Sequence, residues 1–244
     1  MQLKREHIIY YATKYGGNYR AILKAIRNQE KYEEISNCNA ITIIDEDYPD
    51  CFWHLQYPPL CLFYLGNKKL LKGSKIGIVG SRNPLESSIS EIKVIVKNIK
   101  SDYYIVSGLA KGIDGYAHRA AIAFGLKTIG ILANGINYCY PLENRDIYQL
   151  MTKEHLVVSE YPADTKPQKH YFPFRNRLIA CLSDKLIIAD VKMKSGTMVT
   201  VDLALSLNRE IYCMPTNIFE QRDNNQLIKQ GANIICCLDD IRNI

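Results

Sequence analysis

Short apolar runs alternate with helix-like stretches over most of the chain, and this rhythm constrains the fold more than any other feature. The helix-like stretches carry apolar residues three and four positions apart, as at Ile92, Ile95 and Ile99. Strands that are apolar throughout are buried on both faces, as in a parallel sheet covered by helices on both sides. The sequence therefore predicts an α/β fold with a mostly parallel, doubly wound sheet. The runs expected to form strands are Lys75–Val79, Tyr103–Val106, Thr128–Leu132, Leu156–Val158, Lys185–Ala189, Glu210–Cys213 and Ala232–Ile235.

The first part of the chain has a different texture. Two short amphipathic helical patterns, Arg5–Lys14 and Asn18–Gln29, precede a loop rich in proline and aromatic residues around Tyr57–Pro59. We therefore expect a short helical N-terminal module with a linker over residues 1–67. A Rossmann-like domain is expected over residues 68–244.

The composition excludes several classes of protein. Hydrophobic residues at 47% and charged residues at 23% are typical of a folded globular chain. No stretch approaches the roughly 20 apolar residues of a membrane span, and the first residues lack the features of a signal peptide, so we expect a cytoplasmic protein without membrane contact. The eight cysteines show no C-x-x-C pair, which predicts reduced thiols and no metal site. The net charge of +6 favours a polyanionic partner.

Three loops that would follow strands combine glycine with hydroxyl or basic side chains. Ligands of an open parallel sheet bind beyond the carboxyl ends of its strands, where loops lead into helix N-termini. None of the three loops matches a standard nucleotide fingerprint, which disfavours ATP and NAD, so no cofactor is expected. Ordinary turns and helix caps would explain each loop alone, but together they predict an anion-binding crevice. Its expected lining is Gly80, Ser81, Arg82, Ser107, Gly108, Lys111, Gly112, Ser195, Gly196 and Thr197.

Residues 169–177 place basic groups and aromatic rings in one short segment. Bases stack on aromatic faces while Arg and Lys follow the phosphates, and this mixture suits single-stranded nucleic acid. A set of aromatic side chains packed into the core is the alternative interpretation. The residues expected to contact a strand are Lys169, Phe172, Arg175, Asn176 and Arg177.

A series of motifs, in order along the chain, resembles the DNA processing protein A (DprA/Smf) family. The motifs are Gly80–Arg82, Val106–Asp114, Ala117–Arg119, Tyr140–Asn144, Ser159–Pro162, Phe172–Ile179, Ser195–Thr197 and Asn225–Ala232. The resemblance runs from about Tyr48 to Ile235 and covers the whole expected sheet domain. It implies an extended Rossmann-like core, and nothing in this sequence corresponds to the winged-helix domain found at the C-terminus of many members.

The resemblance also implies a function. Members of the family bind single-stranded DNA during DNA uptake in natural transformation and in homologous recombination, protect the incoming strand, help to load RecA and form homodimers. It implies DNA contacts by Arg82, Lys169, Phe172 and Arg175, with a further contact near Asn225, and no catalytic step. Asp114, His118 and Glu160 are interpreted as structural partners of the loops. Two departures are Asp223-Asn224, where Gly-Ser is usual, and Asn134, where threonine is common.

The rival interpretation is a nucleotide-binding or nucleotide-hydrolysing protein of the lysine decarboxylase-like (LOG) type, because that family shares a related fold. Its motif P-G-G-x-G-T-x-x-E ends in a glutamate that serves the chemistry. Here Ser195-Gly196-Thr197 leads to Thr200 at the position of that glutamate. This difference favours DNA binding.

Overall fold

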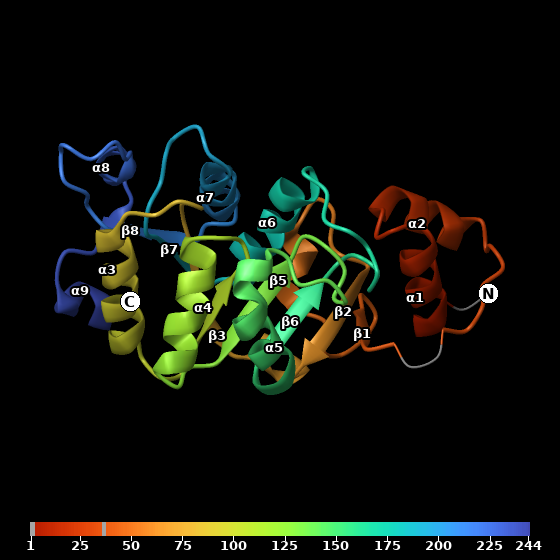
Figure 1. The fold of residues 1–244 in the computed structure, drawn as a ribbon. Coiled ribbons are helices and arrows are strands. Elements are labelled where there is room, and N and C mark those ends of the chain that lie inside the picture. Colours follow the sequence, from red (N-terminus) through yellow and green to blue (C-terminus); the bar gives the residue numbers. More distant parts are fainter. Residues whose placement is uncertain (1–2, 36–37) are drawn as a thin grey trace.

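A nine-stranded sheet covered by helices on both faces forms the body of the computed structural model, which describes residues 3–35 and 38–244 (Figure 1). The expected α/β fold with a mostly parallel sheet is confirmed. The strands are β1 (Ala40–Thr42), β2 (Cys61–Gly66), β3 (Ser74–Val79), β4 (Tyr103–Ser107), β5 (Thr128–Leu132), β6 (Leu156–Ser159), β7 (Lys185–Ile188), β8 (Glu210–Cys213) and β9 (Asn233–Ile234). The helices are α1 (Arg5–Lys14), α2 (Tyr19–Arg27), α3 (Glu86–Asn98), α4 (Ile113–Ala123), α5 (Arg145–Glu154), α6 (Tyr171–Leu182), α7 (Gly196–Ser206), α8 (Asn224–Lys229) and α9 (Leu238–Arg242).

The strand order places a reversal point in the middle of the sheet. The order is β1-β2-β6-β5-β4-β3-β7-β8-β9, so the chain first builds outward from β3 through β4, β5 and β6, then returns to β3 and continues on its other side with β7. All pairings from β6 to β9 are parallel. Because β3 and β7 are neighbours whose following helices leave in opposite directions, a crevice opens beyond their carboxyl ends.

Adjacent residues of the central strands pack into two different cores, one on each face of the sheet. On β4, Ile105 contributes to the core beneath α3 and α4, while Val106 contributes to the core beneath α6 and α7. Ile187 and Ile188 of β7 divide in the same way. Because successive side chains of a strand point to opposite faces, a strand buried on both sides must be apolar throughout, as its sequence is.

The N-terminal helices pack against one end of the sheet, on a third core that includes Ile8, Ile22 and Phe63 (Figure 1). Asn18 begins α2 by accepting a hydrogen bond from the Ala21 backbone at 3.0 Å, as an N-cap residue does. Strands β1 and β2 lie on the N-terminal side of residue 67 and yet belong to the sheet, because β2 pairs antiparallel with β6. The boundary at residue 67 stays a prediction, and residues 1–2 and 36–37 of the expected module lie outside the described part.

Within residues 3–35 and 38–244, the helices are too short or too polar to cross a bilayer.

Candidate nucleic-acid interface

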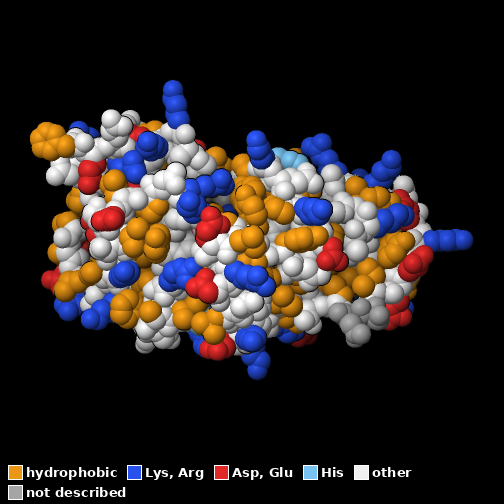
Figure 2. Space-filling view, in the orientation of Figure 1, with side chains coloured by type: hydrophobic (Ala, Val, Ile, Leu, Met, Phe, Trp, Pro, Cys, Tyr) orange, Lys and Arg blue, Asp and Glu red, His pale blue; other side chains and the backbone are white. Residues whose placement is uncertain are grey.

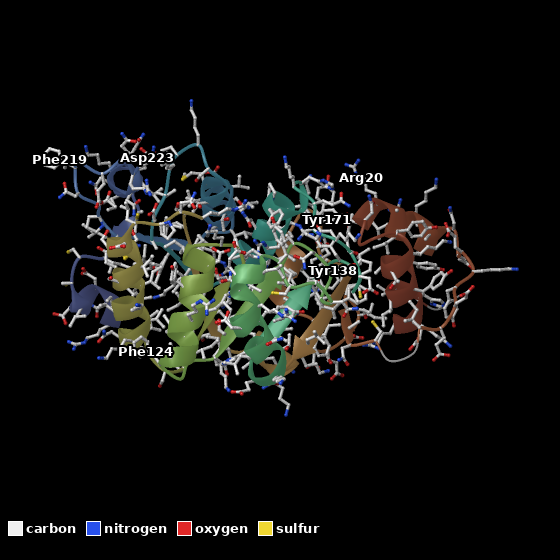
Figure 3. All side chains as sticks on the ribbon, viewed as in Figure 1. Arg20, Phe124, Tyr138, Tyr171, Phe219 and Asp223 are labelled. Carbon is white, nitrogen blue, oxygen red and sulfur yellow. The ribbon has the colours of Figure 1, made fainter. Side chains whose placement is uncertain are left out.

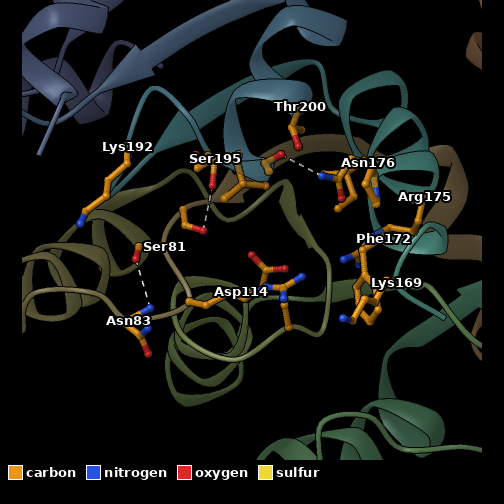
Figure 4. Close-up of a pocket in the computed structure, with 18 residues that line it drawn as sticks. Ser81, Asn83, Asp114, Lys169, Phe172, Arg175, Asn176, Lys192, Ser195 and Thr200 are labelled. Carbon is orange, nitrogen blue, oxygen red and sulfur yellow. Dashed lines mark hydrogen bonds between the residues drawn. The ribbon is translucent and has the colours of Figure 1, made fainter. Parts of the chain in front are cut away.

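A pocket of about 430 Å³ occupies the crevice beyond β3 and β7 (Figure 4). Four segments line it: the loop after β3, the start of α4, the first turns of α6, and the loop that leads from β7 into α7. Most of the residues expected from sequence meet here. Those that line the pocket are Gly80, Ser81, Arg82, Lys169, Phe172, Arg175, Asn176, Ser195, Gly196 and Thr197.

The loop after β3 is held close to its neighbours. A Cβ atom at Gly80 would lie 2.6 Å from Ile113 Cγ1 and 3.0 Å from the Asp190 carbonyl oxygen, so only glycine fits. The Gly80 carbonyl accepts a hydrogen bond from Thr197 Oγ1 at 3.0 Å, which joins this loop to α7. Arg82 remains exposed at the mouth of the pocket. A fixed backbone therefore carries an exposed guanidinium group.

The N-terminus of α7 faces the same pocket. Ser195 is its N-cap, and Gly196 and Thr197 are its first residues. The Ser195 hydroxyl is buried and has no hydrogen-bond partner among the described residues. Free backbone N–H groups and the helix dipole favour an anion at such an end. A phosphate oxygen would satisfy both these groups and the Ser195 hydroxyl.

Residues 169–177, expected only as a basic and aromatic segment, form the start of helix α6 and the two residues before it. Pro173 lies in the first turn of α6, where a missing backbone N–H costs nothing. Lys169 is exposed just before the helix, and Phe172 and Asn176 line the pocket. Asn176 Nδ2 donates to the Gly196 carbonyl at 3.2 Å, which fixes α6 against α7 (Figure 4). This segment therefore presents the Phe172 ring and the exposed Lys169 to the crevice.

Arg175 lies in the buried wall of the pocket, with 4% of its surface exposed. It donates a hydrogen bond to the Ile131 carbonyl oxygen, and Asp114 lies nearby. Burial raises the pKa of Asp114, and the positive charge of Arg175 opposes that rise. Because its guanidinium group already has a backbone partner, Arg175 supports the pocket wall, and a direct DNA contact by this residue stays a prediction.

The glycine-rich loop after β4 supports the pocket from behind. A Cβ atom at Gly108 would overlap the side chains of Arg175 and Asp114. His118 Nε2 donates to the Gly108 carbonyl at 2.5 Å, and its Nδ1 lies 2.7 Å from the Thr128 hydroxyl. Burial lowers the pKa of His118 to about 4, so the ring is neutral at neutral pH. His118 therefore joins the loop after β4 to β5, and the structural roles expected for Asp114 and His118 stay predictions.

Several residues expected at the interface lie outside the pocket lining. Ser107 is fully buried and donates to the Ile78 carbonyl at 2.6 Å. Lys111 and Gly112 belong to the turn before α4, where Gly112 has a φ of +84°. None of these three residues, nor Gly108, is among the lining residues.

Arg177 is placed differently from its expected role. Its Nη2 lies 2.7 Å from both carboxylate oxygens of Glu160, and both side chains are buried. The guanidinium carbon also lies 3.9 Å from the centroid of the Phe174 ring. A DNA strand in the pocket would reach Arg177 only if this ion pair broke. Arg177 is therefore not part of the proposed interface. Glu160 was expected to partner a nearby loop, and its ion-pair partner is instead Arg177 of α6.

The residues near 224 that depart from the usual family motif hold the loop after β7 in place. Asn224 is fully buried, and its Oδ1 accepts from the Val191 backbone at 3.0 Å. Asp223 accepts from the Met193 backbone at 2.7 Å. Asn225 pairs instead with the backbone of Thr216, at 3.0 Å and 2.7 Å, and does not line the pocket. These residues position the loop without facing the crevice.

Sequence reasoning did not single out Asn83, Lys192 and Thr200 as part of the pocket lining. Lys192 is exposed and follows β7 by only four residues, so its place after a strand end was a usable signal. Together with Arg82 and Lys169 it gives the mouth of the pocket three exposed cations.

A possible metal-binding cluster lies far from the loops after β3 and β7 in the sequence. Cys236, Cys237 and Asp240 hold their ligand atoms within 4.8 Å of one another at the start of α9. Asp240 Oδ2 accepts hydrogen bonds from the backbone N–H groups of Cys236 and Cys237 at 2.8 and 2.9 Å, as a helix-capping side chain does. Helix capping explains the cluster without an ion, and the expectation of a metal-free chain stays a prediction.

Comparisons with known proteins agree on one family. A family model for DNA recombination-mediator protein A matches residues 39–244. DNA processing protein DprA of Bacillus subtilis is 42% identical over 207 residues, 83% of this chain and 70% of that protein. The X-ray structure of DNA processing protein A from Streptococcus pneumoniae has a TM-score of 0.82 at 32% identity, covering 91% of this chain and 79% of that chain. DNA processing protein A from Helicobacter pylori, in a structure that concerns its single-stranded DNA binding mode, has a TM-score of 0.77 at 31% identity, covering 85% and 96%. The chain therefore belongs to the DNA recombination-mediator protein A family, the family of the DprA and Smf proteins.

Proposed function

We propose that this protein binds single-stranded DNA in the pocket beyond β3 and β7 and acts in DNA processing and recombination. One observation carries the proposal: exposed Arg82, Lys169 and Lys192 surround the Phe172 ring at the mouth of a pocket that also contains a helix N-terminus. Cations and a helix N-terminus attract phosphates, while the ring offers a stacking face for a base. Single strands expose both groups at once.

Family membership supports the finer parts of the proposal. The Helicobacter pylori relative is described by its single-stranded DNA binding mode, and the Bacillus subtilis and Streptococcus pneumoniae relatives are named DNA processing protein DprA. We infer from this resemblance that the protein acts in the cytoplasm during natural transformation and homologous recombination, protects incoming strands, helps to load RecA and forms a homodimer.

Binding without catalysis agrees best with the described lining of the pocket. Asp114 is its one carboxyl group, and that group is buried beside Arg175 rather than presented to a substrate. Thr200 occupies the position of the glutamate that LOG-type enzymes use, and its hydroxyl is a far weaker base than a carboxylate. Nucleotide hydrolysis is therefore the less favoured function.

Fluorescence anisotropy with a labelled oligo-dT tests the proposal. Arg82→Ala should weaken binding about 10- to 150-fold, because a charge-assisted hydrogen bond contributes about 1.5–3 kcal/mol. Arg27→Ala removes an equally exposed arginine from α2, outside the pocket, and should bind as the wild type does. Normal binding by Arg82→Ala would refute the proposed site. Release of free base from nucleoside monophosphates would instead favour the rival function.

A further inference from the structure

A second groove, of about 520 Å³, lies between the N-terminal helices and the first turn of α6. The turn between α1 and α2, the loop before β2, the end of β6 and α6 contribute its walls. Arg20 from α2 and Tyr171 from α6 both line it, and Figure 3 shows them near each other in the region between those helices. Six aromatic residues dominate the lining: Tyr15, Tyr19, Tyr57, Tyr161, Tyr171 and Phe174.

The aromatic rings of this groove are ordered in pairs. Tyr161 and Tyr171 are stacked with centroids 4.0 Å apart and planes 25° apart. Tyr19 and Tyr57 meet edge to face at 5.5 Å. Phe174 is 37% exposed, and Tyr19, Tyr57 and Tyr171 are partly exposed, so the groove offers ring faces on the sides that Arg177 and Tyr161 do not cover. Such faces stack nucleic-acid bases of any identity.

The charge of the groove suits a polyanion. Arg20 is exposed and donates to the Tyr57 hydroxyl at 3.2 Å, and His170 is exposed at the start of α6. The lining formed by described residues contains no Asp or Glu. Figure 2 shows basic side chains and a histidine along the edge of the molecule above α6 and the N-terminal helices. Phosphates near these groups would meet no opposing negative charge from the lining.

One buried polar group in the lining lacks a partner. The Tyr161 side chain is only 4% exposed, and its hydroxyl forms no hydrogen bond with the described residues. A buried hydroxyl without a partner is costly, by about 1–3 kcal/mol in mutational series.

The groove and the pocket share the first turns of α6. Phe172 and Asn176 of α6 line the pocket, whereas Tyr171 and Phe174 of the same helix line the groove. A helix with its side chains is about 10 Å across, which about three stacked nucleotides would span. A DNA strand that leaves the pocket could therefore cross the start of α6 and enter the groove within a few nucleotides.

We propose that the groove is a second subsite for the same single-stranded DNA, where bases a few nucleotides from those in the pocket stack on Tyr57, Tyr171 and Phe174. The proposal rests on the DNA-binding function proposed above. It makes the N-terminal helices part of the DNA-binding surface through Tyr19 and Arg20. It also makes affinity depend on strand length, because a short oligonucleotide fills the pocket alone.

Binding affinities for a long and a short oligonucleotide distinguish the groove from the pocket. Tyr57→Ala and Arg20→Glu should each bind an oligo-dT of about 16 nucleotides at least about fivefold more weakly than wild type, which is the contribution of one stacked base. Both variants should bind an oligo-dT of about 4 nucleotides, measured by competition, as wild type does. Arg27→Glu on α2 and Tyr116→Ala on α4 are the matched controls for charge and ring. Arg20 is exposed, so its substitution tests the groove without threatening the fold.

Failure of the second subsite and failure of the proposed function would give different binding results. Wild-type affinity that does not rise with strand length, or groove variants that bind the long strand normally, would overturn the second subsite while leaving the pocket intact. Arg27→Glu weakening binding as much as Arg20→Glu would also overturn it, because the effect would then be one of net charge. Failure of the wild type to bind either strand would remove the proposed function itself.

Discussion

The guanidinium group of Arg82 lies over the ring of Phe172, with Cζ 5.1 Å from the ring centroid. The two residues come from the loop after β3 and from α6, so the tertiary fold alone brings them together. A cation and a flat apolar face side by side can receive a phosphate and a base of one strand at the same time. This pairing distinguishes the pocket from a cradle for phosphate alone.

Replacing Phe172 by alanine should remove stacking and leave the electrostatics unchanged. We expect Phe172→Ala to bind oligo-dT about 5- to 150-fold more weakly, because one stacked base contributes about 1–3 kcal/mol. Anisotropy at several salt concentrations should show a slope of log K against log salt equal to that of wild type. Tyr116→Ala, an exposed ring on α4, is the control. A flatter slope for Phe172→Ala would argue against stacking.

Two lysines of one loop should behave differently. Lys192 lines the pocket, whereas Lys194 is equally exposed but does not. We expect Lys192→Ala to reduce the salt slope of oligo-dT binding by about 0.7, the value for one phosphate contact on a single strand. Lys194→Ala should leave the slope unchanged. Equal effects of the two substitutions would mean that the strand follows the general charge of the loop rather than the pocket.

Two glycines of the site should respond to alanine in opposite ways. Gly108→Ala would force a methyl group against the buried Arg175 and Asp114 side chains, so we expect it to lower the free energy of unfolding by about 1–3 kcal/mol. Gly196 begins α7 with open space around its Cα, and Gly196→Ala should be neutral or stabilising by up to about 1 kcal/mol. Urea unfolding measures both. Equal stability of the two variants would show that the loop after β4 has room to move.

The buried pair of Arg177 and Glu160 should affect stability in a pH-dependent way. Arg177→Met leaves a buried carboxylate without its partner, and we expect a loss of about 3–5 kcal/mol near neutral pH. Burial raises the pKa of Glu160 and Arg177 opposes that rise, so the pKa should rise further in the variant. The folded variant then binds more protons than the unfolded chain above the unfolded pKa, and its stability falls as pH rises. Urea unfolding should therefore show a smaller difference from wild type at pH 5 than at pH 8. A difference independent of pH would contradict this account.

The parallel strands were predictable because burial on both faces leaves a continuous apolar run, as in β3, β4 and β5. Strands β1 and β2 were not recognised, because β1 has only three residues and β2 follows the Pro58-Pro59 loop. The start of α6 was hidden by Pro173, which local preferences place outside helices although the first turn tolerates it.

The loops of the site were predictable from their position after strands, but the roles of single cations were not. Arg82 and Arg177 look equally suited to phosphate in the sequence. Only the packing shows that one is exposed and the other is buried against Glu160. Burial of a charge depends on partners distant in sequence, which a local pattern does not contain. Lys192 is different, because it is exposed and its place four residues after β7, rather than its packing, was the signal that could have found it.

The most direct measurement compares wild-type binding to a labelled oligo-dT and to a duplex of the same length as salt is raised. The account predicts tighter binding to the single strand and a log–log salt slope of about −2 or steeper, because Arg82, Lys169 and Lys192 would each neutralise about one phosphate. Binding to duplex that equals or exceeds binding to the single strand, or affinity that does not change with salt, would contradict the central claim.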